Sequence, residues 1–318
     1  MRHVWHNNTL ACQTDATSLT LDDSGAPALG DDILLLILLY RSRMHKLRRS
    51  QRTQIMALSP VSATSPKRIA VEAHGPLARI TLTNPPLNVI DIQMMDELLA
   101  ALREVEQRKE ISVVILCGGE RGFSAGVDVA VHTPDKIQIM LQKFHGVIGA
   151  LVKFPKITIA EVHGVCLGGG AELAMICDMA YTTEKAKWGF PEITLGCYPP
   201  VACTALAALV GQKRAAELVF TGRTFSGEEA AALGLANEAH PEGELQEAIQ
   251  RTVDHLLKLS PAALAVAKKA FYAWDSMHLD KGLARAEKIY LEELMQTEDA
   301  QEGIAAWMEK RKPVWRGK

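Results

Sequence analysis

Two carboxylates, Glu172 and Glu192, stand where acid/base chemistry could take place. Glu172 follows the glycines Gly168-Gly169-Gly170 in a run of mostly good helix formers, and Glu192 follows the turn signal Gly189-Phe190-Pro191. The first N–H groups of a helix that begins at these glycines have no internal partner and lie at the positive end of its dipole. Such a junction can hold a developing negative charge. Two carboxylates near it indicate acid/base chemistry beside an oxyanion.

Each acidic residue also has an ordinary structural interpretation. A glutamate in a first helical turn is typically a dipole-compatible cap, and a glutamate after proline is typically solvated. A third acid, Asp128, ends the small-residue loop 123–128, in which Ala125 and Gly126 lie. The loop follows a buried strand, and ligands of α/β folds gather beyond the carboxyl ends of strands. For Asp128, a helix cap is favoured over a catalytic role.

The elements that must position these residues follow from hydrophobic periodicity. Strands are predicted where short apolar or alternating runs end at turn signals, and helices where apolar residues recur every three or four positions. The predicted strands are 77–82, 111–116 and 157–162, and the predicted helices are 91–105, with Asp91 as N-cap, 136–154 and 171–176. Strands and helices alternate in this order, which indicates a layered α/β core with parallel strands.

Composition restricts the class of protein further. The 318 residues carry a formal net charge of −2, so a basic field that would attract nucleic acid is absent and a small-molecule partner is favoured. The six cysteines form no C-x-x-C pair and no spacing typical of a zinc site. No metal is therefore predicted, and a reduced, cytoplasmic compartment is favoured.

The first 66 residues differ from the rest. The apolar run 33–40 is too short to span a bilayer and a basic run, 41–52, follows it. We interpret residues 1–66 as a poorly ordered extension, or as an artefact of start-site choice with Met56 opening the working chain. The alternative is docking on a membrane surface or a partner; no membrane partner is expected.

A nucleotide-binding dehydrogenase is disfavoured. Its G-x-G-x-x-G motif would need a glycine where Leu173 lies, and no G-x-x-x-x-G-K-[ST] loop occurs in the chain.

Several separated motifs, in order, resemble the crotonase superfamily of enoyl-CoA hydratases and isomerases. They are the loop 123–128, His163-Gly164 with the segment 167–174, Pro191-Glu192-Ile193, and the C-terminal segment 302–313. The resemblance extends from about residue 67 to the end. It implies an α/β spiral of ββα repeats over 67–260, a helical C-terminal region over 261–318 that serves trimerisation, and a homotrimer or dimer of trimers.

The resemblance also implies an acyl-CoA thioester substrate and no separate cofactor, since CoA is part of the substrate. The backbone N–H groups of Val127 and Gly169 would form the oxyanion hole. Glu172 and Glu192 match the two glutamates that position water and exchange a proton with the acyl chain, which favours hydration; which of them activates water stays open. Further substrate or CoA contacts are expected at Ala125, Gly126, Asp128, Gly168, Gly170, Tyr198, Pro199, Trp307 and Lys310, the last two toward a neighbouring subunit.

The substrate is indicated by a closer resemblance to the cyclohexa-1,5-dienecarbonyl-CoA hydratases of anaerobic benzoyl-CoA degradation. It rests on the segments 84–91, 126–136 and 196–202, where Tyr198-Pro199-Pro200-Val201 replaces a glycine-rich segment of ordinary enoyl-CoA hydratases. Two prolines would stiffen a wall of the pocket and so suit a ring. Ala130, where many relatives have lysine, puts the usual CoA contacts in doubt. The alternatives are a general enoyl-CoA hydratase/isomerase of fatty-acid β-oxidation and a non-catalytic crotonase-like or RNA-binding protein.

Overall fold

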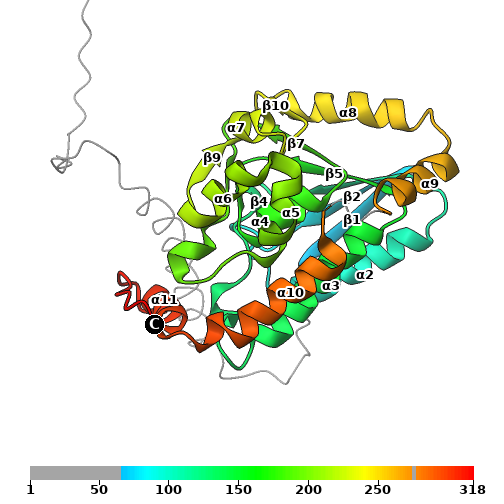
Figure 1. Ribbon diagram of the computed structural model, residues 1–318. Coiled ribbons are helices and arrows are strands. Elements are labelled where there is room, and N and C mark those ends of the chain that lie inside the picture. The colour runs from blue at the N-terminus through cyan, green and yellow to red at the C-terminus, as the bar shows by residue number, and fades with distance from the viewer. Residues whose placement is uncertain (1–65, 274–276) are drawn as a thin grey trace, which may run out of the picture. The chain divides into compact units, whose positions relative to one another are not determined.

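The computed structural model describes residues 66–273 and 277–318 (Figure 1). The predictions made for the N-terminal extension therefore lie outside the described residues, apart from Pro66. The strands are β1 (Ile69–His74), β2 (Leu77–Leu82), β3 (Val113–Cys117), β4 (Gly122–Ser124), β5 (Ile157–Val162), β6 (Val165–Leu167), β7 (Met179–Thr183), β8 (Lys187–Gly189), β9 (Thr224–Ser226) and β10 (Glu238–His240).

Helices follow most strand pairs. The α-helices are α2 (Ile92–Gln107), α3 (Ile137–Lys153), α4 (Gly169–Ile176), α5 (Pro200–Val210), α6 (Gln212–Thr221), α7 (Gly227–Ala232), α8 (Leu245–Leu256), α9 (Pro261–Phe271), α10 (Leu279–Glu292) and α11 (Glu298–Glu309). Three 3₁₀ turns complete the described elements: η1 (Val129–Val131), η2 (Pro191–Leu195) and η3 (Leu294–Gln296).

Two sheets organise these strands. The larger sheet has the order β1-β2-β3-β5-β7-β10, in which β1 and β2 are antiparallel and the remaining pairs are parallel. The smaller sheet has the order β4-β6-β8-β9, with only the last pair antiparallel. The successive pairs β3/β4, β5/β6 and β7/β8 each give one strand to each sheet, and a helix follows each pair. This repetition is a spiral of ββα units, as the resemblance implied.

The central parallel strands β3 and β5 are buried on both faces, which explains their nearly continuous apolar sequences. All six residues of β5 are buried. Side chains alternate across a strand, so Val114 and Leu116 of β3 join the main core with α2 and α3, whereas Val113 and Ile115 join a second cluster with α8. The sheet therefore lies between two helical layers.

Local capping sets the helix boundaries largely as the sequence predicts. Asp91 Oδ1 accepts a hydrogen bond from Met94 N at 2.8 Å, so Asp91 is the N-cap of α2. The predicted strands 77–82 and 157–162 match β2 and β5 in both bounds, and α4 begins at the glycines. The predicted strand 111–116 begins two residues later, at Val113.

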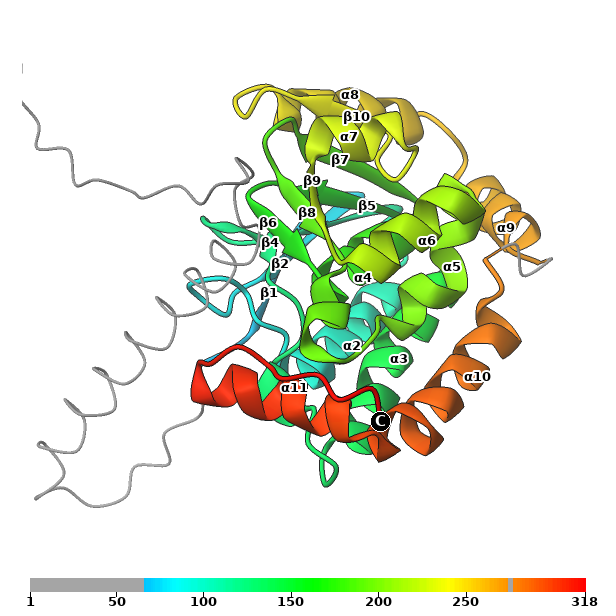
Figure 2. The same cartoon turned by 60° about the vertical axis from the view of Figure 1, so that its left-hand side comes forward.

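The C-terminal part, from α9 onward, is helical. Helix α10 packs against α3 and α5, and α11 packs against η2, so the C-terminal helices cover segments that are remote from them in sequence (Figures 1 and 2). No helix in the described part of the chain is long and apolar enough to cross a membrane.

Candidate active site

Two loops from successive repeats meet at one end of the spiral. Gly126, in the loop after β4, has a φ of +96°, which favours glycine. A Cβ atom there would lie 2.8 Å from Leu167 O and 3.4 Å from Gly169 N. Gly126 is therefore required both by its backbone conformation and by the close approach of the two loops.

The amides of Val127 and Gly169 are available at this junction. Ile90 N donates to Gly126 O at 2.9 Å and Asp128 N donates to Ile90 O at 3.1 Å, which fixes the peptides on either side of Val127. Gly169 is the first residue of α4, where an N–H group has no acceptor within the helix. Within the described residues, neither amide donates a hydrogen bond to a backbone carbonyl.

Glu172 lies in the first turn of α4, yet its carboxylate bonds to another helix. Its side chain is buried, and Oε1 accepts hydrogen bonds from the amides of Val201 and Ala202, both at 2.9 Å. These are the first amides of α5, because the first residue of that helix is Pro200, which has no N–H. The carboxylate thus supplies the N-terminal cap that α5 lacks in its own sequence.

Glu192 approaches the same place from η2. Gly168 N donates to Gly189 O at 2.9 Å, which ties the start of α4 to the end of β8. A Cβ atom at Gly168 would lie 2.7 Å from Glu192 Oε1, so the carboxylate lies directly over this glycine. Glu192 is partly exposed as a residue, but its Oε2 atom is buried and has no hydrogen-bond partner among the described residues. The interpretation of Glu192 as a solvated side chain is therefore wrong.

The two carboxyl groups have shifted and mutually dependent pKa values. Burial raises the pKa of Glu172 to about 7, although the amides of Ala202 and Val201 oppose this rise by favouring the ionised form. Burial and, next, the negative charge of Glu172 raise the pKa of Glu192 well above its usual range. Near neutral pH the pair therefore retains at least one proton, held mainly by Glu192, which has fewer donors, while Glu172 is the more readily ionised of the two.

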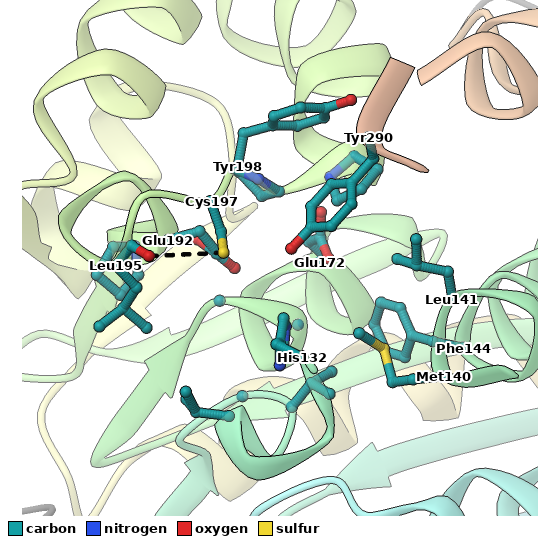
Figure 3. Close-up of a pocket in the computed structure, with 18 of the residues that line it drawn as sticks. His132, Met140, Leu141, Phe144, Glu172, Glu192, Leu195, Cys197, Tyr198 and Tyr290 are labelled. Atoms are coloured by element: carbon teal, nitrogen blue, oxygen red, sulfur yellow. Dashed lines mark hydrogen bonds between the residues drawn. The ribbon is translucent and has the colours of Figure 1, made fainter. Parts of the chain in front are cut away.

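Both glutamates face a cavity with a volume of about 80 Å³ (Figure 3). Apolar and aromatic side chains from α3 and α10 form its opposite wall, among them Phe144 and Tyr290. One water molecule needs roughly 10–15 Å³ of such volume. The cavity can therefore hold several waters or part of a small ligand. Burial lowers the pKa of His132, which also lines the cavity, so this imidazole is neutral near pH 7.

The structure brings most of the sequence-predicted site residues together. Those that line the cavity are Ala125, Gly126, Val127, Gly168, Gly169, Glu172, Glu192, Tyr198 and Pro199. They come from three successive repeats, because the turns that follow β4, β6 and β8 lie side by side at one end of the smaller sheet.

Four predicted residues lie outside the cavity lining. Asp128 accepts a hydrogen bond from Ala130 N at 3.0 Å and caps η1, as the favoured interpretation predicted. Gly170 faces Ser124, whose Cβ would lie 2.8 Å from a Cβ atom at this glycine. Trp307 is half-buried on α11, and Lys310, with a φ of +60°, ends that helix at the surface. The expected CoA contacts of these residues stay predictions.

Sequence reasoning did not single out several lining residues for the site. Tyr290 and Phe144 lie on helices whose amphipathic patterns indicate packing alone, and His132 was noted only as part of a motif. No local signal separates a buried side chain that lines a cavity from one that fills a core. Among the described residues, no group of three or more His, Cys, Asp or Glu side chains could hold a metal ion.

Comparisons with known proteins agree with this geometry. Residues 72–318 match the family model described as enoyl-CoA hydratase/isomerase. The chain is 34% identical over 253 residues to a cyclohexa-1,5-dienecarbonyl-CoA hydratase of Thauera aromatica, a match that covers 80% of this chain and 98% of the relative. It is 35% identical over 247 residues to a probable enoyl-CoA hydratase of Bacillus subtilis, covering 76% and 95%.

The fold has a counterpart among crystal structures. An enoyl-CoA hydratase from Mycobacterium avium subsp. paratuberculosis superimposes with a TM-score of 0.71 at 25% identity, and the match covers 78% of this chain and 98% of that one. Fold, cavity and sequence define one class of protein: the chain belongs to the enoyl-CoA hydratase/isomerase family. It is a hydro-lyase of the enoyl-CoA hydratase type.

Proposed function

We propose that this protein adds water to a conjugated acyl-CoA thioester and that its substrate is cyclohexa-1,5-diene-1-carbonyl-CoA. The observation that carries the hydration is the arrangement of Glu172 and Glu192 around one cavity, next to the amides of Val127 and Gly169. Hydration needs a base for water, an acid for the protonated carbon and a site for negative charge on the carbonyl oxygen. Residues of a type that could fill each of these three roles line the cavity, which supports the proposal.

The environments of the glutamates divide the acid/base work. The amides of Val201 and Ala202 stabilise the ionised form of Glu172, which we assign as the base that takes a proton from water. Glu192 lacks such donors and retains a proton, which we assign to the α-carbon of the thioester. Water forms one C–O bond and loses one proton, and the acyl group gains one C–H bond, so the reaction consumes one water and leaves the protein's protons balanced.

The amides of Val127 and Gly169 would bind the thioester oxygen. Negative charge develops there as water adds to the conjugated system, so preorganised donors stabilise the transition state more than the ground state. Donors of this kind contribute on the order of 3 kcal/mol each.

A cyclic acyl group is supported by the wall of the cavity. Pro199 and Pro200 have restricted backbones and are both buried; Pro199 follows Tyr198, and Pro200 is the first residue of α5. Tyr198 is fixed in turn, because its hydroxyl donates to Ala286 O at 2.6 Å. A wall held in this way suits a rigid ring better than a flexible chain. The similarity to the Thauera aromatica hydratase points to the same substrate.

The second candidate is a general enoyl-CoA hydratase of fatty-acid β-oxidation. The similarity to the Bacillus subtilis protein favours it, since its identity to this chain is equally high. A side-by-side hydration assay with cyclohexa-1,5-dienecarbonyl-CoA and crotonyl-CoA, with products followed by mass spectrometry, separates the two. Higher kcat/KM for the dienoyl thioester supports the cyclic substrate. Higher kcat/KM for crotonyl-CoA supports the second candidate, and water added to neither overturns the hydratase function.

The remaining elements of the proposal concern assembly and location. We propose a cytoplasmic homotrimer or dimer of trimers that needs no cofactor beyond the CoA of its substrate. Exposed apolar side chains on the C-terminal helices, such as Phe271 and Met308, support assembly through this region. Trp307 and Lys310 would then contact substrate in a neighbouring subunit. Sedimentation of the wild-type protein tests the oligomeric state. A titration of the Lys310→Ala variant with CoA tests the proposed contact between Lys310 and the substrate.

A further inference from the structure

The aromatic ring of Tyr290 reaches the active-site cavity from α10, outside the ββα spiral. The residue is 1% exposed, and its ring packs against that of Tyr198 with 5.0 Å between centroids and an interplanar angle of 61°. Its hydroxyl points into the cavity, toward the side on which Cys197 and Glu192 lie (Figure 3). Tyr198 instead directs its hydroxyl to Ala286 O. The two rings therefore differ in what their hydroxyls can bind.

The Tyr290 hydroxyl is a buried polar group without a partner. Among the described residues, no atom forms a hydrogen bond of normal geometry with it, and the same holds for Glu192 Oε2. The nearby thiol of Cys197 is a weak donor and acceptor. An unpartnered buried hydroxyl is costly and rare, so its presence requires an explanation. A molecule in the cavity could partner the hydroxyl and Glu192 Oε2 together.

The hydroxyl keeps its proton throughout the physiological range. Burial, followed by the influence of Cys197 and Glu192, raises the pKa of Tyr290 well above its usual value. A neutral phenol is a hydrogen-bond donor that does not add a third negative charge beside the two glutamates.

Helix α10 holds this hydroxyl at a fixed position. Within one turn of Tyr290, the Ala286 carbonyl accepts the Tyr198 hydroxyl at 2.6 Å, and Glu287 Oε2 lies 2.5 Å from His145 Nδ1 on α3. Burial lowers the pKa of His145 while Glu287 opposes that shift, so this contact is a hydrogen bond within a packed interface. Anchors to two parts of the spiral limit the movement of the phenol.

We propose that the Tyr290 hydroxyl donates a hydrogen bond to the oxygen of the water that is added to the substrate. The inference rests on the proposed hydratase function. A water molecule has two hydrogens and two lone pairs. One hydrogen goes to Glu172, the other to Glu192 Oε2, and one lone pair accepts from Tyr290. The remaining lone pair is then directed at the acyl chain.

This arrangement orients the reacting water without changing the chemical balance. Glu172 still removes one proton from water, the water oxygen still forms the C–O bond, and Glu192 still protonates carbon. Tyr290 neither gains nor loses a proton. Its contribution is to orient the water molecule. This orientation matters most in the transition state, because the rate depends on the angle at which the water oxygen attacks.

The test compares Tyr290→Phe with Tyr181→Phe. The first variant removes the hydroxyl and keeps the ring that packs on Tyr198. The second removes a buried hydroxyl that bonds to Thr252 Oγ1 at 2.7 Å, between β7 and α8, away from the cavity. Full-length wild type and both variants are assayed for hydration of crotonyl-CoA and cyclohexa-1,5-dienecarbonyl-CoA. Deuterium exchange at the α-carbon of butyryl-CoA, which needs the enolate but no attacking water, is measured in parallel.

We expect Tyr290→Phe to lower the hydration kcat about tenfold, the effect of one lost hydrogen bond to a reacting group, with KM within twofold of wild type. Exchange with butyryl-CoA and the melting temperature should stay near the wild-type values, and Tyr181→Phe should keep wild-type kcat. Unchanged hydration by Tyr290→Phe overturns the inference. A parallel loss of hydration and exchange in Tyr290→Phe also overturns the inference, because it would mean that Tyr290 positions the oxyanion hole or the group that exchanges the α-proton. A wild type that hydrates neither thioester overturns the proposed function itself.

Discussion

Glu172 Oε1 accepts a hydrogen bond from the amide of Val201 at 2.9 Å, so a carboxylate on α4, the helix of one repeat, caps α5, the helix of the next repeat. The same oxygen accepts the amide of Ala202. Pro200 removes the competing first amide of α5 and presets the helical φ angle there. The positive end of α5 therefore stabilises negative charge on Glu172 inside an apolar cavity.

Replacement of either glutamate by glutamine should abolish most turnover. We expect Glu172→Gln and Glu192→Gln to lower kcat by about 10²–10⁴-fold, because each removes one proton-transfer group. The amide oxygen of glutamine can still accept from the amides of α5, so the circular dichroism spectrum should stay close to wild type and show that the fold is kept. Hydration by either variant at more than half the wild-type rate would contradict the assignment.

The division of roles predicts different effects on α-carbon exchange. If Glu192 exchanges a proton with the α-carbon, Glu192→Gln should lose both hydration and deuterium exchange into butyryl-CoA. Glu172→Gln should lose hydration while exchange continues, since exchange needs no base for water. Mass spectrometry of butyryl-CoA after incubation in heavy water measures this. The opposite pattern would exchange the two assignments.

Stability should depend on pH through Glu172. Its pKa is about 7 in the folded protein and 4.5 ordinarily. Below pH 4.5 both states bind the proton and burial of the neutral group is favoured. Between pH 4.5 and 7 the unfolded state releases the proton first, so the free energy of unfolding falls, by roughly 3 kcal/mol in total. The Glu172→Gln variant has no carboxyl group at this position, so its free energy of unfolding should not fall for this reason between pH 4.5 and 7.

Thermal unfolding at pH 5 and pH 8 measures the difference. The melting temperature of Glu172→Gln minus that of wild type should be higher at pH 8 than at pH 5. Tyr181→Phe serves as a control, since its effect on the melting temperature should be the same at both pH values. An equal offset for Glu172→Gln at the two pH values would mean that Glu172 titrates normally.

The titration of Glu192 should respond to its neighbour. Burial is the larger cause of its raised pKa and the charge of Glu172 is the second. Glu172→Gln removes that charge, so the pKa of Glu192 should fall but stay above the ordinary range. Infrared difference spectra of the carboxyl band across pH follow this change. A pKa unaffected by the substitution would show that the two groups titrate independently.

The oxyanion hole should tolerate no side chain at Gly169. A Cβ atom there would lie 2.7 Å from Val127 Cγ2 and 3.1 Å from Phe144 Cζ, so in Gly169→Ala the Val127 side chain must shift, and we expect the two amide loops to move apart with it. We expect kcat to fall about 10²–10³-fold, the cost of losing one preorganised donor. A matched control is Gly146→Ala in α3, where a Cβ atom meets nothing within 4 Å.

In the control variant, alanine should stabilise the helix by about 0.5–1 kcal/mol and leave kcat unchanged. Initial rates with the preferred thioester and a urea titration of each variant provide both quantities. Wild-type kcat in Gly169→Ala would mean that this amide does not bind the thioester oxygen.

Much of the architecture was predictable because local signals are strong in this chain. The alternation over β2, the continuous apolar run of β5 and the N-cap Asp91 each mark an element within a few residues. The start of β3 was misplaced by two residues, since an apolar run does not reveal which of its residues pair with neighbouring strands.

The sequence by itself determined the family and indicated the two glutamates and the two amide loops as the candidate site, because each lies in a short motif whose residue types and spacing are specific. Tertiary structure decided what surrounds them. Glu172 could be predicted in a first helical turn, but its bonds to α5 arise from the packing of separate repeats. Tyr290 enters the cavity from a helix 98 positions beyond Glu192, as their residue numbers show. Hydrophobic periodicity indicates which face of α10 is buried, whereas only the packed fold determines whether that face packs in a core or lines the active-site cavity.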